Sequence, residues 1–267
     1  MTETLAEPEA FSVDAFLGGR VEAVQPRAGH HRSGLDAVLI AAAFADGAEG
    51  RVVDLGAGAG VAGFCLAARA ATVDVVLAER EADLVDAARR ALERPANAAF
   101  RDRAHPVAAD ILTAAGRRQA GLLPASFELA LMNPPFYEAG AVRSSPRAHR
   151  AAAHVLTEAG LDGWFRAAAA VLAPGGMLAA ILPAARLGDL VAALDGRFGG
   201  VHLLPIHSRA SQPALRVIAR ATKGSRAPLA IQPGLILHDT DGNGFSAPLS
   251  AILREGAALC DVHPWPA

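Results

Sequence analysis

The stretch LMNPPFYEAG, residues 131–140, ends an apolar run with an asparagine, two prolines and an aromatic ring. Proline has no backbone N–H, so Pro134 and Pro135 cannot continue the interior of a sheet and instead form a rigid, extended turn. Such a turn presents the side-chain amide of Asn133, the carbonyl of Pro134 and the ring of Phe136 beyond the strand. Two hydrogen-bond acceptors beside an aromatic ring are suited to holding a planar nitrogen group.

A second stretch, DLGAGAG at residues 54–60, combines a carboxylate with three glycines. It follows a short β-branched run and precedes an apolar segment, so it lies where a strand passes into a helix. Gly56, Gly58 and Gly60 let the backbone bend tightly and approach a ligand, and the free amides at the helix start attract negative charge. In an open α/β sheet this position is the ligand crevice.

The elements that must position these motifs alternate along the chain. Strands are expected over residues 51–55, 73–79, 106–110, 127–132, 177–183, 201–205, 216–222 and 229–237. Helices are expected over residues 35–44, 61–70, 81–94, 161–172 and 247–254, and a short strand or hairpin followed by a loop over residues 19–34. Because continuous apolar strands alternate with helices, the predicted fold class is α/β, with a mostly parallel sheet covered on both faces.

The glycine turn by itself leaves two cofactor classes open. Glycines within residues 58–63 also fit the GxGxxG pattern of dinucleotide sites, and Glu79 lies at about the distance along the chain, roughly 20 residues, that such a site requires. Against this alternative, Tyr137 and Lys223 are the only tyrosine and lysine of the chain. They cannot form, at neighbouring helical positions, the Tyr and Lys pair of many nicotinamide reductases. A hydride-transfer enzyme also has no evident use for NPPF.

Four motifs, taken in chain order, resemble those of Rossmann-like S-adenosylmethionine-dependent methyltransferases. They are DLGAGAG, Glu79 at the end of the second strand, Asp110 after the third and NPPF after the fourth. The resemblance implies S-adenosylmethionine as the cofactor and a mostly parallel seven-stranded sheet flanked by helices, with a short N-terminal extension.

The same resemblance implies roles for individual residues. The Gly56–Gly60 backbone is expected to pack under the methionine portion of the cofactor, and Glu79 is expected to accept both ribose hydroxyls. A single carboxylate suits that task because it can accept two hydroxyl hydrogens in a bidentate pair. The expected cofactor-binding residues are Asp54, Gly56, Gly58, Gly60, Glu79, Asp110 and Ile111, the last two flanking the adenine, together with Asn133.

The NPPF turn fits methyl transfer to an amine. An exocyclic amine on a purine is a weak nucleophile, because its lone pair is delocalised into the ring. If Asn133 Oδ1 and the Pro134 carbonyl each accept one amine hydrogen, the nitrogen is drawn towards tetrahedral geometry and is stabilised as positive charge develops. The nitrogen then meets the sulfonium methyl in line, without a strong general base. The expected catalytic residues are therefore Asn133, Pro134, Pro135 and Phe136.

The sequences at the two ends of the chain narrow the choice of methyl acceptor. NPPF alone is compatible with an adenine amine, a guanine amine of rRNA or a glutamine side chain of a translation factor. HHRSGLDAVLIAAAF and the region 216–253 resemble the ends of the bacterial valine tRNA adenine-N6 methyltransferase group, over roughly Val13 to Leu259. This resemblance implies RNA, and specifically tRNA, as the partner. The chain departs from the commoner pattern in having Ser33 and Gly34 ahead of LDA.

The charge distribution permits an RNA-binding face although the formal net charge is −2. Residues 139–157 and 196–238 contain no acidic residue. Phosphate contacts are expected from Arg143, Arg147, Arg150, Arg216 and Lys223. Ordinary solvated surface arginines remain the alternative, because charge runs by themselves are weak evidence.

Length and composition indicate the size of the core, the domain organisation and the location of the protein. A chain of 267 residues that is 52% hydrophobic can bury a full core. We expect residues 1–45 to form an N-terminal extension of one methyltransferase domain that covers residues 46–267. The acidic start does not match a signal peptide, and Pro174 interrupts the apolar window at 167–185, so a cytoplasmic protein without membrane contact is expected.

Metal and disulfide chemistry is not expected. Cys65 and Cys260 have no metal-ligand spacing and are interpreted as inert thiols. His30 and His31 lack nearby carboxylates or cysteines at suitable spacing and are interpreted as exposed loop residues. The sequence carries no indication of the oligomeric state.

Overall fold

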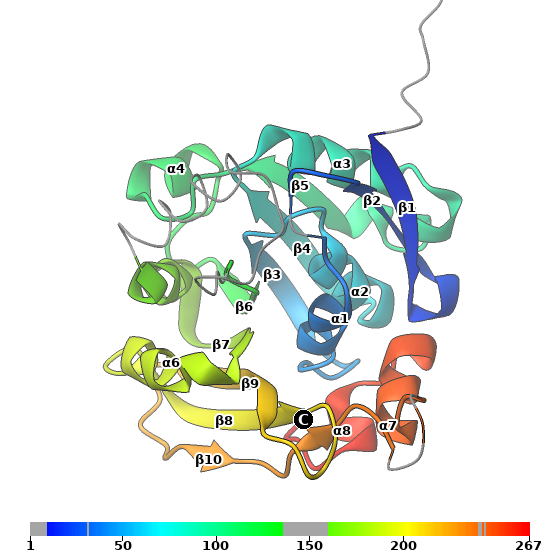
Figure 1. Cartoon of the computed structure of the whole chain (residues 1–267). Helices are drawn as coiled ribbons and strands as arrows, with labels where there is room; N and C mark the ends of the chain where they lie inside the picture. Colours follow the sequence, from blue (N-terminus) through cyan, green and yellow to red (C-terminus); the bar gives the residue numbers. More distant parts are fainter. Residues whose placement is uncertain (1–9, 31, 136–159, 240–241, 243) are drawn as a thin grey trace, which may run out of the picture.

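The computed structural model describes residues 10–30, 32–135, 160–239, 242 and 244–267. Within this part of the chain, nine strands form a central sheet in the order β10-β8-β9-β7-β6-β3-β4-β5, with β11 also paired to β8 (Figure 1). The strands are β3 (Glu49–Leu55), β4 (Thr72–Glu79), β5 (Ala104–Ala108), β6 (Phe127–Met132), β7 (Leu172–Pro183), β8 (Phe198–His207), β9 (Ala214–Lys223), β10 (Ala230–Ile231) and β11 (Leu235–Ile236). Because only β9 runs antiparallel to its neighbours, the predicted mostly parallel α/β sheet is confirmed. In the described residues the sheet has nine strands and not the seven that the resemblance implies, because the short strands β10 and β11 also pair with β8.

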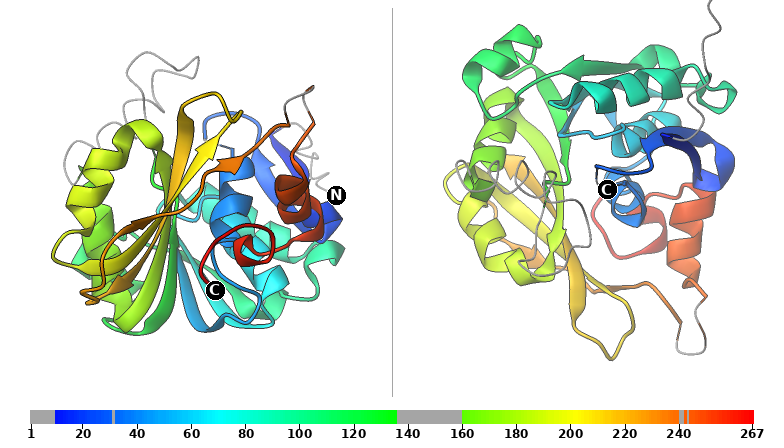
Figure 2. Two further views of the ribbon diagram at one scale, coloured as in Figure 1. Left: turned by 90° about the horizontal axis from the view of Figure 1, so that it is seen from below. Right: turned by 45° about the horizontal axis from the view of Figure 1, so that its top comes forward.

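Helices cover both faces of this sheet. They are α1 (Leu35–Ala41), α2 (Val61–Arg69), α3 (Ala82–Leu92), α4 (Ala114–Gln119), residues 160–171, α6 (Leu187–Leu194), α7 (Ala247–Ser250) and α8 (Leu259–Val262). Short 3-10 turns lie at Leu17–Gly19, Pro95–Asn97, Arg101–Arg103 and Ala184–Arg186, and a π-helical turn lies at Ala251–Glu255. Figure 2 (left) shows α1 and α2 on one face of the sheet and α6 with the 160–171 helix on the other.

Two hydrophobic cores follow from this layering, because successive side chains of a strand point to opposite faces. In β3, Val52 belongs to the core under α1 and α2, whereas Val53 and Leu55 belong to the core under α6 and the 160–171 helix. Each fully buried Val or Leu contributes roughly 1.5–3 kcal/mol relative to an exposed one. The strands are therefore apolar on both faces, as the continuous hydrophobic runs predict.

The N-terminal region forms a hairpin, but its first strand lies before residues 19–34, where a short strand or hairpin is expected from the sequence. Strands β1 (Phe11–Phe16) and β2 (Val21–Pro26) pair antiparallel and pack beside α3 (Figure 1). The buried side chain of Asn97 fastens the hairpin, because its amide accepts from Glu22 N at 2.9 Å and donates to Glu22 O at 2.7 Å. The hairpin then leads through a loop into α1.

Several predicted boundaries differ from the structure. The prediction of one continuous strand over residues 229–237 is wrong, because Pro233 and Gly234 divide this segment into β10 and β11. The third strand, β5, lies two residues earlier than expected and contains Pro106, which is tolerated because β5 is an edge strand. Helices α4 and α6 were not expected. Thr113 caps the start of α4, because its hydroxyl accepts from Gly116 N at 3.0 Å.

The apolar window at 167–185 is divided between the 160–171 helix and strand β7. None of the helices in the described part of the chain has the length and apolarity needed to cross a bilayer.

Candidate active site

Three adjacent strands bring the predicted motifs together. Strand β3 lies between β6 and β4, and its last residue, Leu55, is in register with Met132 of β6 and Ala78 of β4. Because all three strands are parallel, the residues that follow or end them meet at the carboxyl edge of the sheet. Neighbouring strands are about 4.8 Å apart, so the glycine turn, Glu79 and Asn133 lie side by side.

The glycine turn leaves open space at one of its three glycines. Gly56, Gly58 and Gly60 have φ values of +70°, +58° and +86°, a region that residues with a Cβ rarely adopt. A Cβ on Gly56 would lie 2.5 Å from the Trp164 ring, and a Cβ on Gly60 would lie 2.9 Å from the Phe64 ring. At Gly58 the nearest atom would be Ser33 Oγ at 3.9 Å. Packing therefore requires glycine at 56 and 60, whereas Gly58 borders space for a ligand.

Asp54 stabilises the glycine turn through a hydrogen bond to the helix that follows it. Its side chain is 3% exposed, and Oδ2 accepts a hydrogen bond from Gly63 N at 2.9 Å. Burial raises the pKa of Asp54 from 3.8 to about 7, opposed by the Gly63 hydrogen bond and assisted by the charge of Glu79. Asp54 therefore ties the end of β3 to the first turn of α2 and carries little negative charge below neutral pH.

Glu79 is held rigidly at the end of β4. Its Oε2 accepts from Gly58 N at 2.9 Å, and its Oε1 accepts from Arg80 N at 2.7 Å and Glu81 N at 3.0 Å. A carboxylate offers about four acceptor positions, so about one remains, on Oε2. The carboxylate is fixed in orientation and faces the glycine turn.

Asp110 and Ile111 follow β5 at the same edge. Asp110 Oδ1 accepts from Leu112 N at 3.1 Å, which shapes the turn into α4. The Ile111 side chain is 5% exposed, and its carbonyl accepts from Arg117 Nη1 at 2.5 Å. This pair forms the side of the edge that is further from Asn133.

Asn133 and Pro134 end β6 on the other side of the glycine turn. The Asn133 side chain is half-buried and forms no hydrogen bond with any residue that the structure describes. Pro134 is buried and Pro135 is half-buried. Phe136 lies outside the described residues. An amide that has no partner among the described residues can bind a substrate group.

The basic residues predicted to contact RNA do not all lie at the carboxyl edge of the sheet. Arg216 lies at the carboxyl edge, in register with Pro183 at the end of β7, and its Nε is 3.0 Å from Asp36 Oδ2. Lys223 lies at the other end of β9, in register with Phe198, and its Nζ donates to Leu172 O at 2.6 Å. The structure therefore does not bring Lys223 to the site. Arg143, Arg147 and Arg150 lie outside the described residues.

Two residues at this edge were not predicted from the sequence. Trp164 packs on Gly56 and is 5% exposed, and its Nε1 is the buried side-chain polar atom without a partner in the described part of the chain. Ser33 lies over Gly58, from a loop 25 positions earlier in the chain. No spacing rule connects either residue to the glycine turn, because both reach it through tertiary packing.

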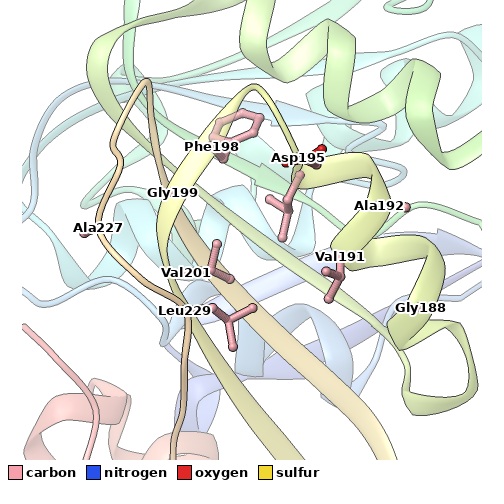
Figure 3. Close-up of a pocket in the computed structure, with 10 residues that line it drawn as sticks. Gly188, Val191, Ala192, Asp195, Phe198, Gly199, Val201, Ala227 and Leu229 are labelled. Atoms are coloured by element: carbon pink, nitrogen blue, oxygen red, sulfur yellow. The ribbon is translucent and has the colours of Figure 1, made fainter.

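A separate pocket of about 470 Å³ lies away from this edge (Figure 3). It lies between α6, the start of β8 and residues 227–229, and Val191, Phe198, Val201 and Leu229 line it. Asp195 is the titratable residue of its lining. The pocket shares no residue with the predicted motifs.

Comparisons with known proteins agree with the geometry. The family model described as methyltransferase small domain matches residues 33–207. A crystal structure from Agrobacterium tumefaciens, described as a predicted O-methyltransferase, has a TM-score of 0.71 and 36% sequence identity, covering 84% of this chain and 97% of that one. No curated protein sequence matches the chain.

Two more distant structures share the fold. The T. thermophilus 16S rRNA N2 G1207 methyltransferase, in complex with AdoMet and guanosine, has a TM-score of 0.56 and 22% identity. The match covers 83% of this chain and 53% of that one. M. jannaschii TYW2, in complex with AdoMet, has a TM-score of 0.52 and 13% identity, covering 82% of this chain and 88% of that one. At these identities the likeness concerns the fold alone.

Proposed function

The chain belongs to the methyltransferase small domain family and is an S-adenosylmethionine-dependent methyltransferase, and on this premise we propose that it methylates the exocyclic amine of adenine in RNA, with tRNA as the substrate. Family membership removes the nicotinamide oxidoreductase alternative that the glycine turn left open. The identity of the methyl acceptor is our own proposal, and it rests on the Asn133–Pro134 turn.

The turn supports an amine acceptor through its hydrogen-bonding capacity. Asn133 Oδ1 is unpaired within the described residues, and the proline at 134 contributes a carbonyl without a competing amide at its own position. Two acceptors at one site hold both hydrogens of an NH₂ group and stabilise the positive charge that develops on nitrogen. A cofactor bound at the adjacent glycine turn would hold its methyl group near that nitrogen.

The residues of the crevice fit the cofactor. When bound, S-adenosylmethionine supplies an electrophilic methyl group on a sulfonium sulfur. We infer that the space at Gly58 admits the cofactor and that Glu79 accepts its ribose hydroxyls. Three backbone amides already occupy the Glu79 carboxylate, so the remaining acceptor position, on Oε2, would accept a ribose hydroxyl. Asp110 and Ile111 would flank the adenine.

Transfer needs little acid–base assistance from the chain. The amine loses its extra proton after methylation, when the nitrogen carries a positive charge and is acidic. Asn133 and the Pro134 carbonyl accept hydrogen bonds and do not remove protons, which suits an amine. An oxygen acceptor, as in the description of the A. tumefaciens protein, would instead need a base to remove its proton.

Two observations support RNA as the partner. The sequence at both ends resembles the valine tRNA adenine-N6 methyltransferase group, and Arg216 lies at the edge where the substrate must enter. We propose that Arg216, with Arg143, Arg147 and Arg150 in the segment that follows Phe136, contacts phosphates. Lys223 is not part of this proposal, because its ammonium group donates to Leu172 O at the far end of β9.

A guanine amine is the second candidate acceptor. The T. thermophilus structure that shares this fold is described as an rRNA guanine-N2 methyltransferase. The same two acceptors at Asn133 and Pro134 would hold a guanine amine equally well, so product identity must separate the two bases.

The proposal is tested by product analysis. The purified protein is incubated with radiolabelled S-adenosylmethionine and, separately, with unmodified total tRNA, rRNA and cell protein, and the labelled nucleoside or amino acid is identified. N6-methyladenosine from tRNA is the expected product. Label in N2-methylguanosine of rRNA, in glutamine or in a hydroxyl of a small molecule would overturn the adenine assignment while leaving the methyltransferase activity intact.

A further inference from the structure

Residues 32–36, here called the strap, lie at the carboxyl edge, lead into the first turn of α1 and are anchored by three separate elements. Arg32 Nη2 lies 2.5 Å from Asp14 Oδ2 of β1. At the other end, Asp36 pairs with Arg216 of β9. Between them, the backbone of Ser33 is bound by a side chain of β2.

That side chain, Gln25, is 2% exposed and has its hydrogen-bonding groups satisfied. Its Oε1 accepts from Ser33 N at 2.8 Å, and its Nε2 donates to Ser33 O at 3.1 Å and to Asp14 Oδ2 at 2.8 Å. Burying an amide is costly unless it is hydrogen-bonded, and here the bonds are used to hold one residue of the strap. Ser33 is therefore held in a defined position, as a preorganised binding residue must be.

Within the part of the chain that the structure describes, the hydroxyl of Ser33 has no hydrogen-bond partner. No hydrogen bond from Ser33 Oγ joins it to any described residue, although the backbone of the same residue forms two. The hydroxyl is the nearest atom to the open side of Gly58, at 3.9 Å from the position that a Cβ would take. Gly58 N in turn donates to Glu79 Oε2. A fixed hydroxyl and a fixed carboxylate thus meet at the same glycine.

We propose that Ser33 is a cofactor-binding residue, whose hydroxyl hydrogen-bonds an oxygen of S-adenosylmethionine above Gly58. Both the ribose hydroxyls and the methionine carboxylate carry oxygens that a serine hydroxyl can bind. The inference rests on the cofactor of the chain and not on the RNA acceptor, so either can fail without the other. Gln25 acts as a positioning residue, because it holds the Ser33 backbone and does not itself lie at Gly58.

Calorimetric titration of Ser33→Ala with two ligands tests the proposal. S-adenosylhomocysteine contains both portions of the cofactor, whereas methylthioadenosine lacks the amino-acid portion. Loss of one neutral hydrogen bond is expected to weaken S-adenosylhomocysteine about 3- to 10-fold. An equal loss with methylthioadenosine would assign the contact to the ribose, and an unchanged affinity for it would assign the contact to the methionine carboxylate.

Ser12→Ala is the matched control, because Ser12 lies on β1 and, among the described residues, its Oγ donates to Asp14 Oδ2, at 3.5 Å. Its affinity for both ligands should equal that of the wild type. Ser33→Thr keeps the hydroxyl and should recover most of the affinity, whereas a purely structural role for Ser33 would not depend on the hydroxyl. Wild-type affinity in Ser33→Ala, or an equal loss in Ser12→Ala, would overturn the proposal.

Discussion

Asn133 and Glu79 lie on either side of the glycine turn and differ in how their polar groups are used. Glu79 accepts three backbone N–H groups, whereas the Asn133 amide has no partner within the described residues. A carboxylate that is already oriented can bind a cofactor without a rearrangement of its side chain. An unpaired amide costs free energy unless a ligand or water satisfies it. Glu79 is thus suited to bind the cofactor, and Asn133 is suited to bind the acceptor.

Replacing Asn133 by alanine separates these two roles. We expect Asn133→Ala to lower kcat by about 100-fold or more, as removal of one transition-state hydrogen-bonding group does elsewhere. Its affinity for S-adenosylhomocysteine, measured by calorimetry, should stay within a few-fold of the wild type. Gln119→Ala, which removes an exposed side-chain amide from α4, serves as the control and should change neither quantity. Undiminished turnover in Asn133→Ala would contradict the assigned role.

Asp54 makes stability depend on pH. Since its pKa is about 7 in the folded protein, above the ordinary value of 3.8, its contribution is complete below about pH 4 and is lost as the pH rises through 7. Asp54→Asn stays uncharged and can still accept from Gly63 N. In denaturant unfolding without cofactor, the wild type should lose roughly 2–4 kcal/mol relative to Asp54→Asn between pH 4 and 8. A difference that is constant over this range would contradict the buried, titrating carboxyl.

At the scale of elements, strand β9 determines which basic residues can meet a substrate. It runs antiparallel to β7, so its first residues lie at the carboxyl edge and its last ones at the opposite edge. Arg216 and Lys223 are seven residues apart, which is roughly 23 Å along an extended strand. A patch of charge in the sequence is therefore divided between the two edges of the sheet.

This division predicts different salt dependences for two variants of one strand. Each phosphate contact adds about 0.7–0.9 to the slope of log affinity against log salt. Arg216→Ala should lower the slope for tRNA binding by about that amount, and Lys223→Ala should leave it unchanged. Asp36→Ala controls for the loss of the Asp36–Arg216 pair, and it should leave the slope unchanged because Arg216 keeps its charge. Equal slopes for Arg216→Ala and the wild type would remove Arg216 from the RNA contacts.

At the scale of the whole molecule, the carboxyl edge of the sheet joins segments that are distant in sequence. The glycine turn, Glu79, Asp110, Asn133 and the strap come from different strands and from the segment that leads into α1. A ligand that contacts several of them at once would stabilise only the folded chain. Binding should therefore be visible as a change in global stability.

Cofactor binding should raise the melting temperature. A ligand present at 100 times its Kd stabilises the folded state by about 2.7 kcal/mol, which corresponds to about 5 °C or more for a chain of this size. We expect this rise in the wild type with S-adenosylhomocysteine, measured by differential scanning calorimetry. Glu79→Ala should show little or no rise at the same ligand concentration, and NAD should have no effect on either protein. A full rise in Glu79→Ala would show that Glu79 is dispensable for binding.

The sequence by itself determined the α/β class, the mostly parallel sheet and the order of the motifs. Those features are local, because a strand, its final residue and the turn after it are contiguous, and parallel strands place all such turns at one edge. The prediction of one strand over residues 229–237 failed, because Pro233 and Gly234 divide it into two short strands. These strands depend on β8 for pairing. Likewise, α4 and α6 are too short for a periodic pattern to indicate them.

Only the tertiary structure decided which distant side chains meet at this edge. Ser33 approaches Gly58 because buried Gln25 holds the strap, and Trp164 packs on Gly56 because the 160–171 helix covers that face of the sheet. The direction of β9 likewise separated Arg216 from Lys223. These contacts depend on how helices and loops pack against the completed sheet. Side chains from separate elements contribute to them jointly, so no single stretch of sequence contains the information.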